Sequence, residues 1–312
     1  GLTVANAIVL ATNSSHPTLT IGTTGSIATV AFSGGITGTN NLTIANTTTT
    51  SLTFSTAAIN NVGTVTHTGT QSGTVTTISG GIGANVTSVT QSSSAIPLTV
   101  SGDLATNASG TTLVKDASTA LFTVSGNISG AGGLTLQNNS TTSSGITLSG
   151  TSVNPSGLIT NSGTGTGSVL ISGAIGTSVT GVTQNSANSM LELSGNNTYT
   201  SATTVSAGTL RVSHNNGLGS TAGGTTVNLN AILDLYSVTV GAEAVTLAGG
   251  TIKDITSSLS GNITLTADSI VSADTGDTLT LSGVISGAFA LTKTGAGTVI
   301  LGNASANSTY SG

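Results

Sequence analysis

The feature that most constrains the fold is a short motif, an apolar residue followed by Ser-Gly, which returns at nearly even intervals. The full motif begins at Phe32, Ile78, Val100, Val124, Leu148, Ile171, Leu193, Leu259 and Leu281. Weaker versions fill the gaps, at Leu10, Phe54, Val212, Leu235 and Leu301. Most neighbours in this series are 22–24 residues apart, and a weaker double period near 46 residues runs through residues 1–190. Such a fixed period indicates a repeat protein.

Each repeat unit has the pattern of short β-strands. Residues 42–44, 98–102 and 279–283 alternate apolar and hydroxyl side chains, which places Leu, Val or Ile inward and Thr or Ser outward. We expect Gly or Asn to turn the corners through positive φ angles. One unit is too small to fold alone, so successive units must stack. The sequence predicts an all-β, parallel β-helix (β-solenoid) of about 14 coils of 22–24 residues, forming a single domain over residues 1–312.

Charge and composition exclude several kinds of partner and chemistry. Only 4% of the residues are charged, against about 25% in a typical soluble domain. Four Lys and Arg residues in total leave no basic patch, so we expect neither nucleic-acid binding nor attraction to anionic membranes. No run of 18 apolar residues predicts a membrane-spanning helix, and the chain has no Cys for disulfides or thiolate ligands.

The few charges are unevenly distributed. Before Met190 the charged residues are Asp103, Lys115 and Asp116, and the remaining ones lie between Glu192 and Lys293. Residues 1–190 therefore form nearly uncharged coils, whereas residues 191–312 carry most of the charge.

Two segments of the charged part share a longer pattern. Residues 191–212 read LELSGNNTYTSATTVSAGTLRV and residues 291–312 read LTKTGAGTVILGNASANSTYSG. Both resemble the passenger-associated repeat of autotransporters, the type V secretion proteins of Gram-negative bacteria. The resemblance implies a right-handed β-helical passenger that is exported to the cell surface and displayed or released. It also implies a C-terminal outer-membrane barrel, so we expect this chain to be a section of a longer protein.

The best candidate for a catalytic site is an acidic cluster. It comprises Asp268, Asp274 and Asp277, with Lys253 and Asp254 less than one coil earlier. Carbohydrate-active β-helices need paired carboxylates with a neutralising cation. However, the Asp274-Thr-Gly-Asp277 sequence is typical of a turn. We therefore expect no catalytic, metal or cofactor site.

Other polar residues have structural interpretations. His16, His67 and His214 fall in different coils, and we expect His67 to be a hydrogen-bonded strand residue on the same face as Val65. Tyr199 and Tyr310 belong to Asn-Thr-Tyr or its variant, where corner packing is favoured over stacking against a glycan. The Asn-x-Ser/Thr sequons, which include those at Asn41, Asn85, Asn127 and Asn262, are about as frequent as chance predicts.

Thr-x-Thr pairs raise the alternative of ice binding, because such pairs aligned on a flat solenoid face can order water. The pairs lie in 63–70, 74–76, 18–20, 264–266, 278–280 and 292–294. They do not recur at one phase of successive coils, which counts against this alternative.

The sequence favours an extracellular or cell-surface structural solenoid that forms a stalk, fibre or filament and has an adhesive role. We expect self-association, end to end or laterally, and host or neighbouring-cell glycans as further partners. One alternative is a carbohydrate-binding or carbohydrate-active β-helix, and a second is an ice-binding solenoid. The discriminating tests are glycan binding, release of reducing sugar and thermal hysteresis.

Overall fold

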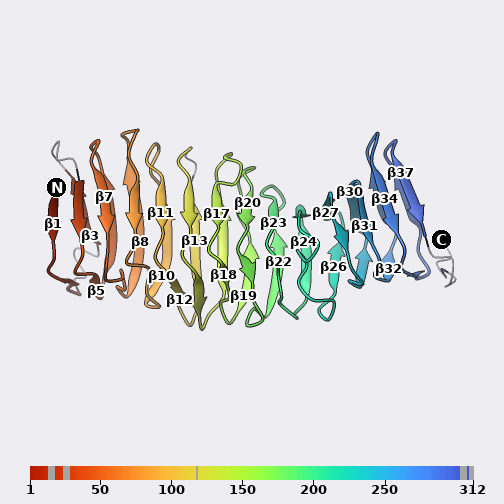
Figure 1. Cartoon of the computed structure of the whole chain (residues 1–312), viewed down its shortest axis with the longest axis horizontal. Helices are drawn as coiled ribbons and strands as arrows, with labels where there is room; N and C mark the ends of the chain where they lie inside the picture. The colour runs from red at the N-terminus through yellow and green to blue at the C-terminus, as the bar shows by residue number, and fades with distance from the viewer. Residues whose placement is uncertain (13–17, 24–28, 117–118, 303–307, 309–312) are drawn as a thin grey trace.

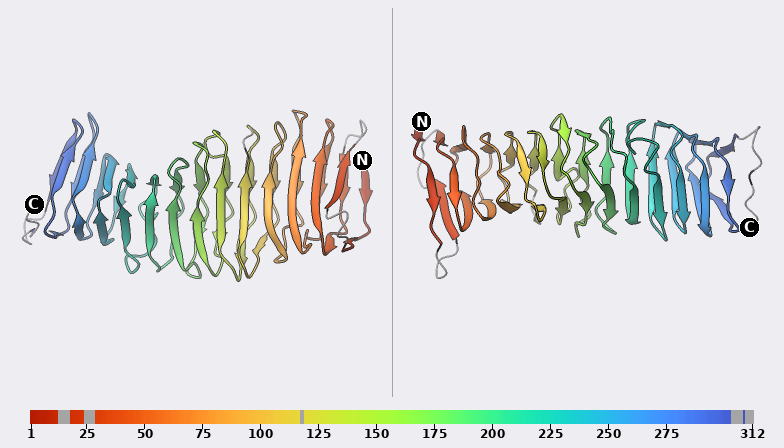
Figure 2. Two further views of the ribbon diagram at one scale, coloured as in Figure 1. Left: turned by 180° about the vertical axis from the view of Figure 1, so that it is seen from behind. Right: turned by 90° about the horizontal axis from the view of Figure 1, so that it is seen from below.

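The computed structural model describes residues 1–12, 18–23, 29–116, 119–302 and 308 of the 312-residue chain. These residues form 37 β-strands and no helix. The strands stack along one long axis, and the first and last strands, β1 and β37, lie at opposite ends of the molecule (Figures 1 and 2). Every pairing between named strands is parallel, so the predicted β-solenoid is confirmed. Among the described residues, no helix is long and apolar enough to cross a membrane.

Two long sheets run the length of the solenoid. Sheet 1 comprises, in spatial order, β1 (Leu2–Val4), β4 (Thr29–Phe32), β7 (Ser51–Phe54), β9 (Thr76–Ile78), β11 (Leu98–Val100), β14 (Phe122–Val124), β17 (Ile146–Leu148), β20 (Val169–Ile171), β23 (Leu191–Leu193), β25 (Thr209–Val212), β27 (Ile232–Tyr236), β30 (Thr251–Ile255), β33 (Ser269–Ala273) and β36 (Leu291–Thr294). Sheet 2 comprises β3 (Thr18–Thr23), β6 (Asn41–Asn46), β8 (Gly63–Gly69), β10 (Val86–Gln91), β13 (Thr111–Lys115), β16 (Leu134–Asn138), β19 (Leu158–Asn161), β22 (Gly181–Asn185), β24 (Thr203–Ala207), β26 (Thr225–Asn228), β29 (Val245–Ala248), β32 (Ile263–Ala267) and β35 (Ile285–Ser286).

The third face is divided into shorter sheets. One contains β2 (Ile8–Leu10) and β5 (Ile36–Gly38), and another contains β12 (Leu104–Thr106), β15 (Ile128–Gly130), β18 (Ser152–Val153) and β21 (Ala174–Ile175). The last contains β28 (Thr239–Val240), β31 (Ser257–Leu259), β34 (Thr278–Leu281) and β37 (Thr298–Leu301). Because only sheet 1 reaches 14 strands, the number of complete coils is slightly smaller than the predicted 14.

Most of the apolar-Ser-Gly positions form one column. On sheet 1 each pairs with the next from Phe32 to Leu235, and all of these side chains except the half-buried Phe32 are buried. The predicted register is wrong at both ends. Leu10 lies on the third face opposite Gly38. Leu259 belongs to another third-face column, which it shares with Leu281 and Leu301.

The register changes after Leu235 because the later coils are shorter. Leu233 pairs with Ile252, and Ile252 with Val271, in each case nineteen residues on. On sheet 1 the place that follows Leu235 is taken by Asp254. A motif that recurs about every 22 residues therefore passes from sheet 1 to the third face once the coils are shorter than that spacing.

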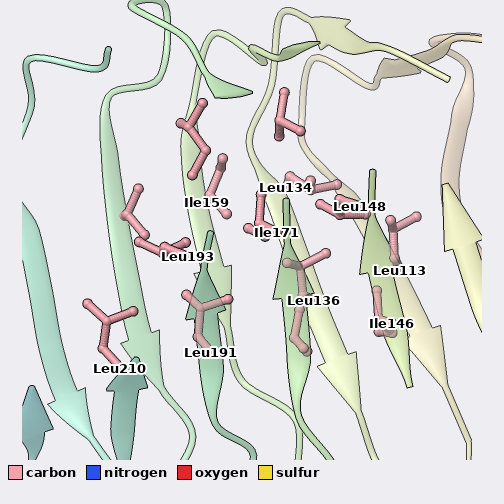
Figure 3. Close-up of a cluster of buried hydrophobic side chains, with 14 of the residues drawn as sticks. Leu113, Leu134, Leu136, Ile146, Leu148, Ile159, Ile171, Leu191, Leu193 and Leu210 are labelled. Carbon is pink, nitrogen blue, oxygen red and sulfur yellow. The ribbon is translucent and has the colours of Figure 1, made fainter. Parts of the chain in front are cut away.

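The interior is a continuous apolar core. Inward side chains of sheets 1 and 2, including Leu136, Leu148, Ile171 and Leu193, point into the space between the strands (Figure 3). Most strands alternate buried and outward residues, as in Leu134–Asn138, so the predicted period of two is confirmed there. Removal of this apolar surface from water, at about 25 cal/mol per Å², is the main force that holds the coils together.

The Gly of the motif is required for close approach between coils rather than for positive φ. A Cβ added at Gly126 would overlap the carbonyl oxygen of Gly102, and one added at Gly150 would overlap that of Gly126. Neither glycine is among those with positive φ. The predicted role of glycine in the motif was therefore wrong, although Gly81 and Gly110, elsewhere in the coils, do have positive φ.

Candidate functional site

The outer face of sheet 2 carries an unbroken column of hydroxyl side chains, which we call the threonine ladder. Its eleven members occupy eleven successive strands in register: Thr64, Ser88, Thr112, Thr135, Thr160, Thr183, Thr204, Thr226, Thr246, Thr264 and Ser286. Each lies beside a buried residue and is itself half-buried or exposed, so the column faces outward. The Thr-x-Thr pairs lie on different faces, but single threonines share one phase, which sequence reading missed.

The hydroxyl groups of the threonine ladder are not hydrogen-bonded to other described groups of the protein. Within the described part of the chain, none of the eleven makes a side-chain hydrogen bond. Their strands carry no charged residue at an outward position, and Lys115 at the end of β13 points inward. The result is a regular, neutral surface that can donate and accept hydrogen bonds.

The outer face of sheet 1 changes character along the solenoid. After Thr3 and Ala31, its central column contains five successive threonines: Thr53, Thr77, Thr99, Thr123 and Thr147. After Leu170 it becomes an alternating charge ladder of Glu192, Arg211, Asp234 and Lys253. The charge ladder is one that sequence reading also missed, because the sequence does not show which charges share a column.

Contacts within the charge ladder are unequal. Arg211 Nε donates to Asp234 Oδ2 over 2.9 Å, and the side chain of Asp234 is almost buried. The guanidinium of Arg211 also lies 4.6 Å from the centre of the Tyr236 ring, within the range of a cation–π contact. Lys253 turns instead to Asp274, with Nζ 3.0 Å from Oδ2, and both of these side chains are substantially exposed.

The predicted acidic cluster is only partly brought together. Asp268 precedes β33 and Asp274 follows it, so a strand that is about 16 Å long separates them. Asp268 accepts a hydrogen bond from the backbone N–H of Ala290. Asp274 and Asp277 form the predicted turn, in which Asp277 N–H donates to the Asp274 carbonyl over 2.9 Å.

Asp254 lies inside the solenoid near this turn. Its Oδ2 accepts from the backbone N–H of Ser257 over 2.8 Å, whereas its Oδ1 has no partner in the protein. Burial raises the pKa of Asp254, and the nearby charges of Asp277, Asp234 and Asp274 raise this pKa further. In the described residues, no three His, Cys, Asp or Glu side chains form a group that could hold a metal ion.

A shallow groove of about 270 Å³ lies on the third face beside this turn. Its hydroxyl-bearing lining comes from β28, β31, β34 and the preceding corners: Ser237, Thr239, Thr256, Ser258, Thr278 and Thr280. Ser237 and Thr256 have positive φ angles of 53° and 46°, which are unusual for residues with a Cβ and common at ligand sites. Tyr236, next to Ser237, is 40% exposed. The groove itself is lined mainly by hydroxyl-bearing residues, and Tyr236 is not part of its lining.

The two described histidines, His67 and His214, lie in different coils. His67 is buried on the same face as Val65, as predicted, and its Nδ1 lies 2.6 Å from Gln91 Oε1. Burial lowers the pKa of His67, an effect that the hydrogen bond to Gln91 Oε1 partly opposes. His214 accepts from the backbone N–H of Asn216 through Nδ1. His16 lies outside the described residues.

The tyrosine and sequon residues mainly connect coils. Tyr199 is fully buried and its hydroxyl lies 2.8 Å from Thr203 Oγ1, so the prediction of corner packing is confirmed. Tyr310 lies outside the described residues. Sequon asparagines such as Asn127 and Asn262 accept hydrogen bonds from the backbone N–H groups of Ser152 and Val284 in the next coil. Two further sequons make similar links between coils. Asn41 Oδ1 accepts from the backbone N–H of Thr64, and the backbone N–H of Asn85 donates to Asn60 Oδ1.

A buried polar row lines the inner face of sheet 2, which sequence reading did not predict. It comprises His67, Gln91, Lys115, Asn138, Asn161 and Gln184. The amides donate to carbonyl groups at the corner that leads to sheet 1: Gln91 to Ile96 O and Asn138 to Ser168 O. Burial lowers the pKa of the Lys115 ammonium. The row braces the corners of the solenoid from inside.

Two segments that differ in position match one known family. Residues 189–212 and 291–312 match the model of the passenger-associated-transport-repeat. The chain carries passenger-associated-transport-repeats. Neither the curated proteins nor the solved structures that were compared with the chain give a match. The repeat and the β-solenoid together support a passenger-like structural domain.

The two passenger-associated-transport-repeats occupy different faces. In the first copy, Leu191–Leu193 forms β23 of sheet 1. In the second copy, the corresponding Thr298–Leu301 forms β37 of the third face, after β36 on sheet 1. The repeat therefore specifies strands and corners but does not by itself specify which sheet a strand joins.

Proposed function

We propose that this chain is a rigid extracellular stalk within an autotransporter-like passenger, displayed at or released from the bacterial surface. The observation that carries this proposal is the unbroken parallel ladder of sheet 1, whose 14 strands extend from one end of the molecule to the other. At about 4.8 Å per coil, the ladder spans about 60 Å. The repeat family supports export, since its passengers are secreted or surface-displayed.

The proposal explains why the interior consists mainly of aliphatic side chains. Like side chains stack on like, and each coil supplies the backbone partners of its neighbours. Such a rod separates whatever is attached to its two ends. We expect the rod to fold one coil after another during export, so that its own folding drives the export.

The test is surface display together with shape. The chain is fused in front of an outer-membrane translocator barrel, and intact cells are probed with an external protease and an antibody against an N-terminal tag. We expect a surface-accessible tag, and an elongated particle when the purified chain is measured by small-angle X-ray scattering. A tag that stays inside the cell, or a compact globular scattering profile, would contradict the proposal.

A second candidate function is saccharide binding in the hydroxyl-lined groove. It is favoured by the hydroxyl groups that line this groove, such as those of Thr256, Ser258 and Thr280, because hydroxyl groups can donate hydrogen bonds to sugars and accept hydrogen bonds from them. Glycan arrays should show binding that Ser258→Ala combined with Thr280→Val abolishes and that Thr123→Val, on the outer face of sheet 1, leaves intact. No glycan binding by the wild-type chain would remove this candidate.

A separate reducing-sugar assay addresses catalysis, for which we propose no role. Asp274 is held in an exposed ion pair with Lys253, and Asp254 is buried at the inner face. We expect no release of reducing sugar from polysaccharides. Turnover that is abolished by Asp274→Asn would overturn this expectation.

A further inference from the structure

We propose that two copies of this chain pair laterally, with the threonine ladder of one solenoid against the threonine ladder of the other. The pairing goes beyond the stalk function and is independent of it, because a single rod can serve as a stalk without a partner. Four features of the outer face of sheet 2 support a second copy as the occupant.

The first feature is the period. The ladder repeats once per coil over eleven strands, at about 4.8 Å, so a partner must repeat at the same interval to meet every hydroxyl group. A second copy meets this condition along its full length without any adjustment. Identical side chains that stack at this spacing form closely packed interfaces between paired sheets.

The second feature is self-complementarity. Each Thr or Ser hydroxyl can donate one hydrogen bond and accept others, so the same side chain satisfies itself across a two-fold axis. The ladder hydroxyls have no partner within the described chain and are available for such bonds. The threonine methyl groups beside them supply apolar contact.

The third feature is the absence of charge at the outward positions of these strands. The net charge of −5 would oppose association if it were spread over the contact surface. The columns beside the ladder instead carry small neutral residues such as Thr66, Thr90 and Ser162. The outer face of sheet 1, with its charge ladder, lacks this neutrality beyond Leu170.

The fourth feature is area. Eleven coils at about 4.8 Å and strands of about five residues at 3.3 Å give roughly 800 Å² on each partner. A specific protein interface of standard size buries about 800 Å² per partner. The ladder is therefore long enough for a stable pair.

A cross-linking experiment tests the pairing directly. Thr183 is the sixth of the eleven residues, so it faces its own counterpart whether the two solenoids run parallel or antiparallel. Because the chain has no Cys, Thr183→Cys introduces a unique thiol. Facing threonine hydroxyls that hydrogen-bond place their Cα atoms roughly 7 Å apart, at the limit for a disulfide, so a short bis-maleimide is the appropriate reagent. We expect a cross-linked dimer from Thr183→Cys.

The matched control is Thr123→Cys, an outward threonine in the column on sheet 1, which should remain monomeric under the same conditions. Thr64→Cys distinguishes the two orientations, since Thr64 meets itself in a parallel pair and Ser286 in an antiparallel one. Equal cross-linking of Thr183→Cys and Thr123→Cys would overturn the proposal.

Sedimentation over a range of concentrations gives the second measurement. Thr160→Lys with Thr183→Lys should weaken self-association roughly tenfold or more, because it places cations opposite each other, whereas Thr123→Lys with Thr147→Lys should not. A wild-type chain that stays monomeric at its highest soluble concentration would overturn the pairing. Thermal hysteresis of a monomeric chain that the Thr160/Thr183 change removes would assign the face to ice instead, and would also overturn it.

Discussion

The inner face of sheet 2 differs sharply between the two halves of the solenoid. From β8 to β22 it carries the buried polar row, which ends at Gln184. The residue paired with Gln184 on the next coil is Val205, and Val227, Leu247 and Leu265 continue this register column, which is also aliphatic before Asn161, at Leu113 and Leu136. The change lies close to the start of the first passenger-associated-transport-repeat at residue 189. The inner face of this sheet thus carries buried amides beside its aliphatic side chains in the first half, and aliphatic side chains without such amides in strands β24 to β35.

The outer face of sheet 1 changes along the same stretch. Stacked threonines from Thr53 to Thr147 give way to the charge ladder from Glu192 to Lys253. Buried carboxylates also appear only in the second half of the described chain, at Asp234, Asp254 and Glu243. Glu243 accepts a hydrogen bond from Thr225 Oγ1, and burial raises its pKa.

The comparison teaches that one architecture can fix the alignment of its coils in two ways. A slip of one residue would turn every side chain of a strand to the opposite face, so register must be specified. The first half specifies it with neutral amides that reach corner carbonyls, and the second half with opposite charges on adjacent strands. The hydrogen bonds of the amides are buried and independent of salt, whereas the contacts of the charge ladder are partly exposed.

The largest expected effect comes from breaking the amide device. In Asn161→Ala, Gln184 Oε1 and Ser189 O lose donors that lie 2.7 and 2.8 Å away, and Gln184 Oε1 is left buried without one. We expect the free energy of unfolding to fall by about 3 kcal/mol, measured by denaturant titration. Ser162→Ala, the next residue and an outward one, is the control and should change it by less than about 0.5 kcal/mol. Equal effects of the two changes would show that the row does not brace the corner.

A smaller effect is expected from the strongest contact of the charge ladder. Arg211→Leu removes the hydrogen bond to the nearly buried Asp234 and the contact with the Tyr236 ring. We expect a loss of about 2 kcal/mol. A double-mutant cycle with Asp234→Asn isolates the pair, since the loss from Arg211→Leu should shrink when the carboxylate is absent. An unchanged loss would mean that the ring contact, rather than the charge, holds Arg211.

Sequence reasoning predicted the β-solenoid fold but not the columns of polar and charged side chains on its faces. The motif predicted the sheet 1 column from Phe32 to Leu235 because its spacing follows the coils there, even where Leu193 pairs with Val212 nineteen residues on. It failed after Leu235 because the next two coils are nineteen residues long, whereas the motif next recurs 24 residues on, at Leu259 on the third face. Coil length within a repeat can be seen in the sequence, but the corner at which residues are lost depends on tertiary packing.

The threonine ladder and the buried polar row were missed for a related reason. A threonine such as Thr183 looks like any other outward residue until pairing places it between Thr160 and Thr204. Gln184, the next residue, is polar in sequence and yet points inward, because alternation along the strand and not polarity decides its side. Columns are properties of register, and register emerges only when the lengths of all the coils are known.

Acidity should affect the two halves in opposite directions. Burial lowers the pKa of His67, so its contribution to stability is lost as the pH falls below about 6.5, where the unfolded chain takes up a proton first. Burial raises the pKa values of Asp254 and Glu243, so their contribution is present at low pH and is lost as the pH rises from about 4 through the raised values. Hydrogen exchange at pH 7 and pH 4, corrected for intrinsic rates, should show weaker protection around β8 and stronger protection around β30 at pH 4. His67→Gln and Asp254→Asn should each remove the response of their own half only. A parallel response of both halves would contradict the assigned causes.

The smallest effect is expected from the exposed end of the charge ladder. Lys253 and Asp274 lie 3.0 Å apart, but their side chains are 39% and 57% exposed, so water and salt screen their attraction. Lys253→Gln should lower the free energy of unfolding by about 0.5 kcal/mol or less, and 1 M salt should abolish even this difference. The loss from Arg211→Leu should persist in the same salt because Asp234 is almost buried. If both losses vanish in salt, the charge ladder acts only as a surface feature, and the register of the second half must instead come from its aliphatic core.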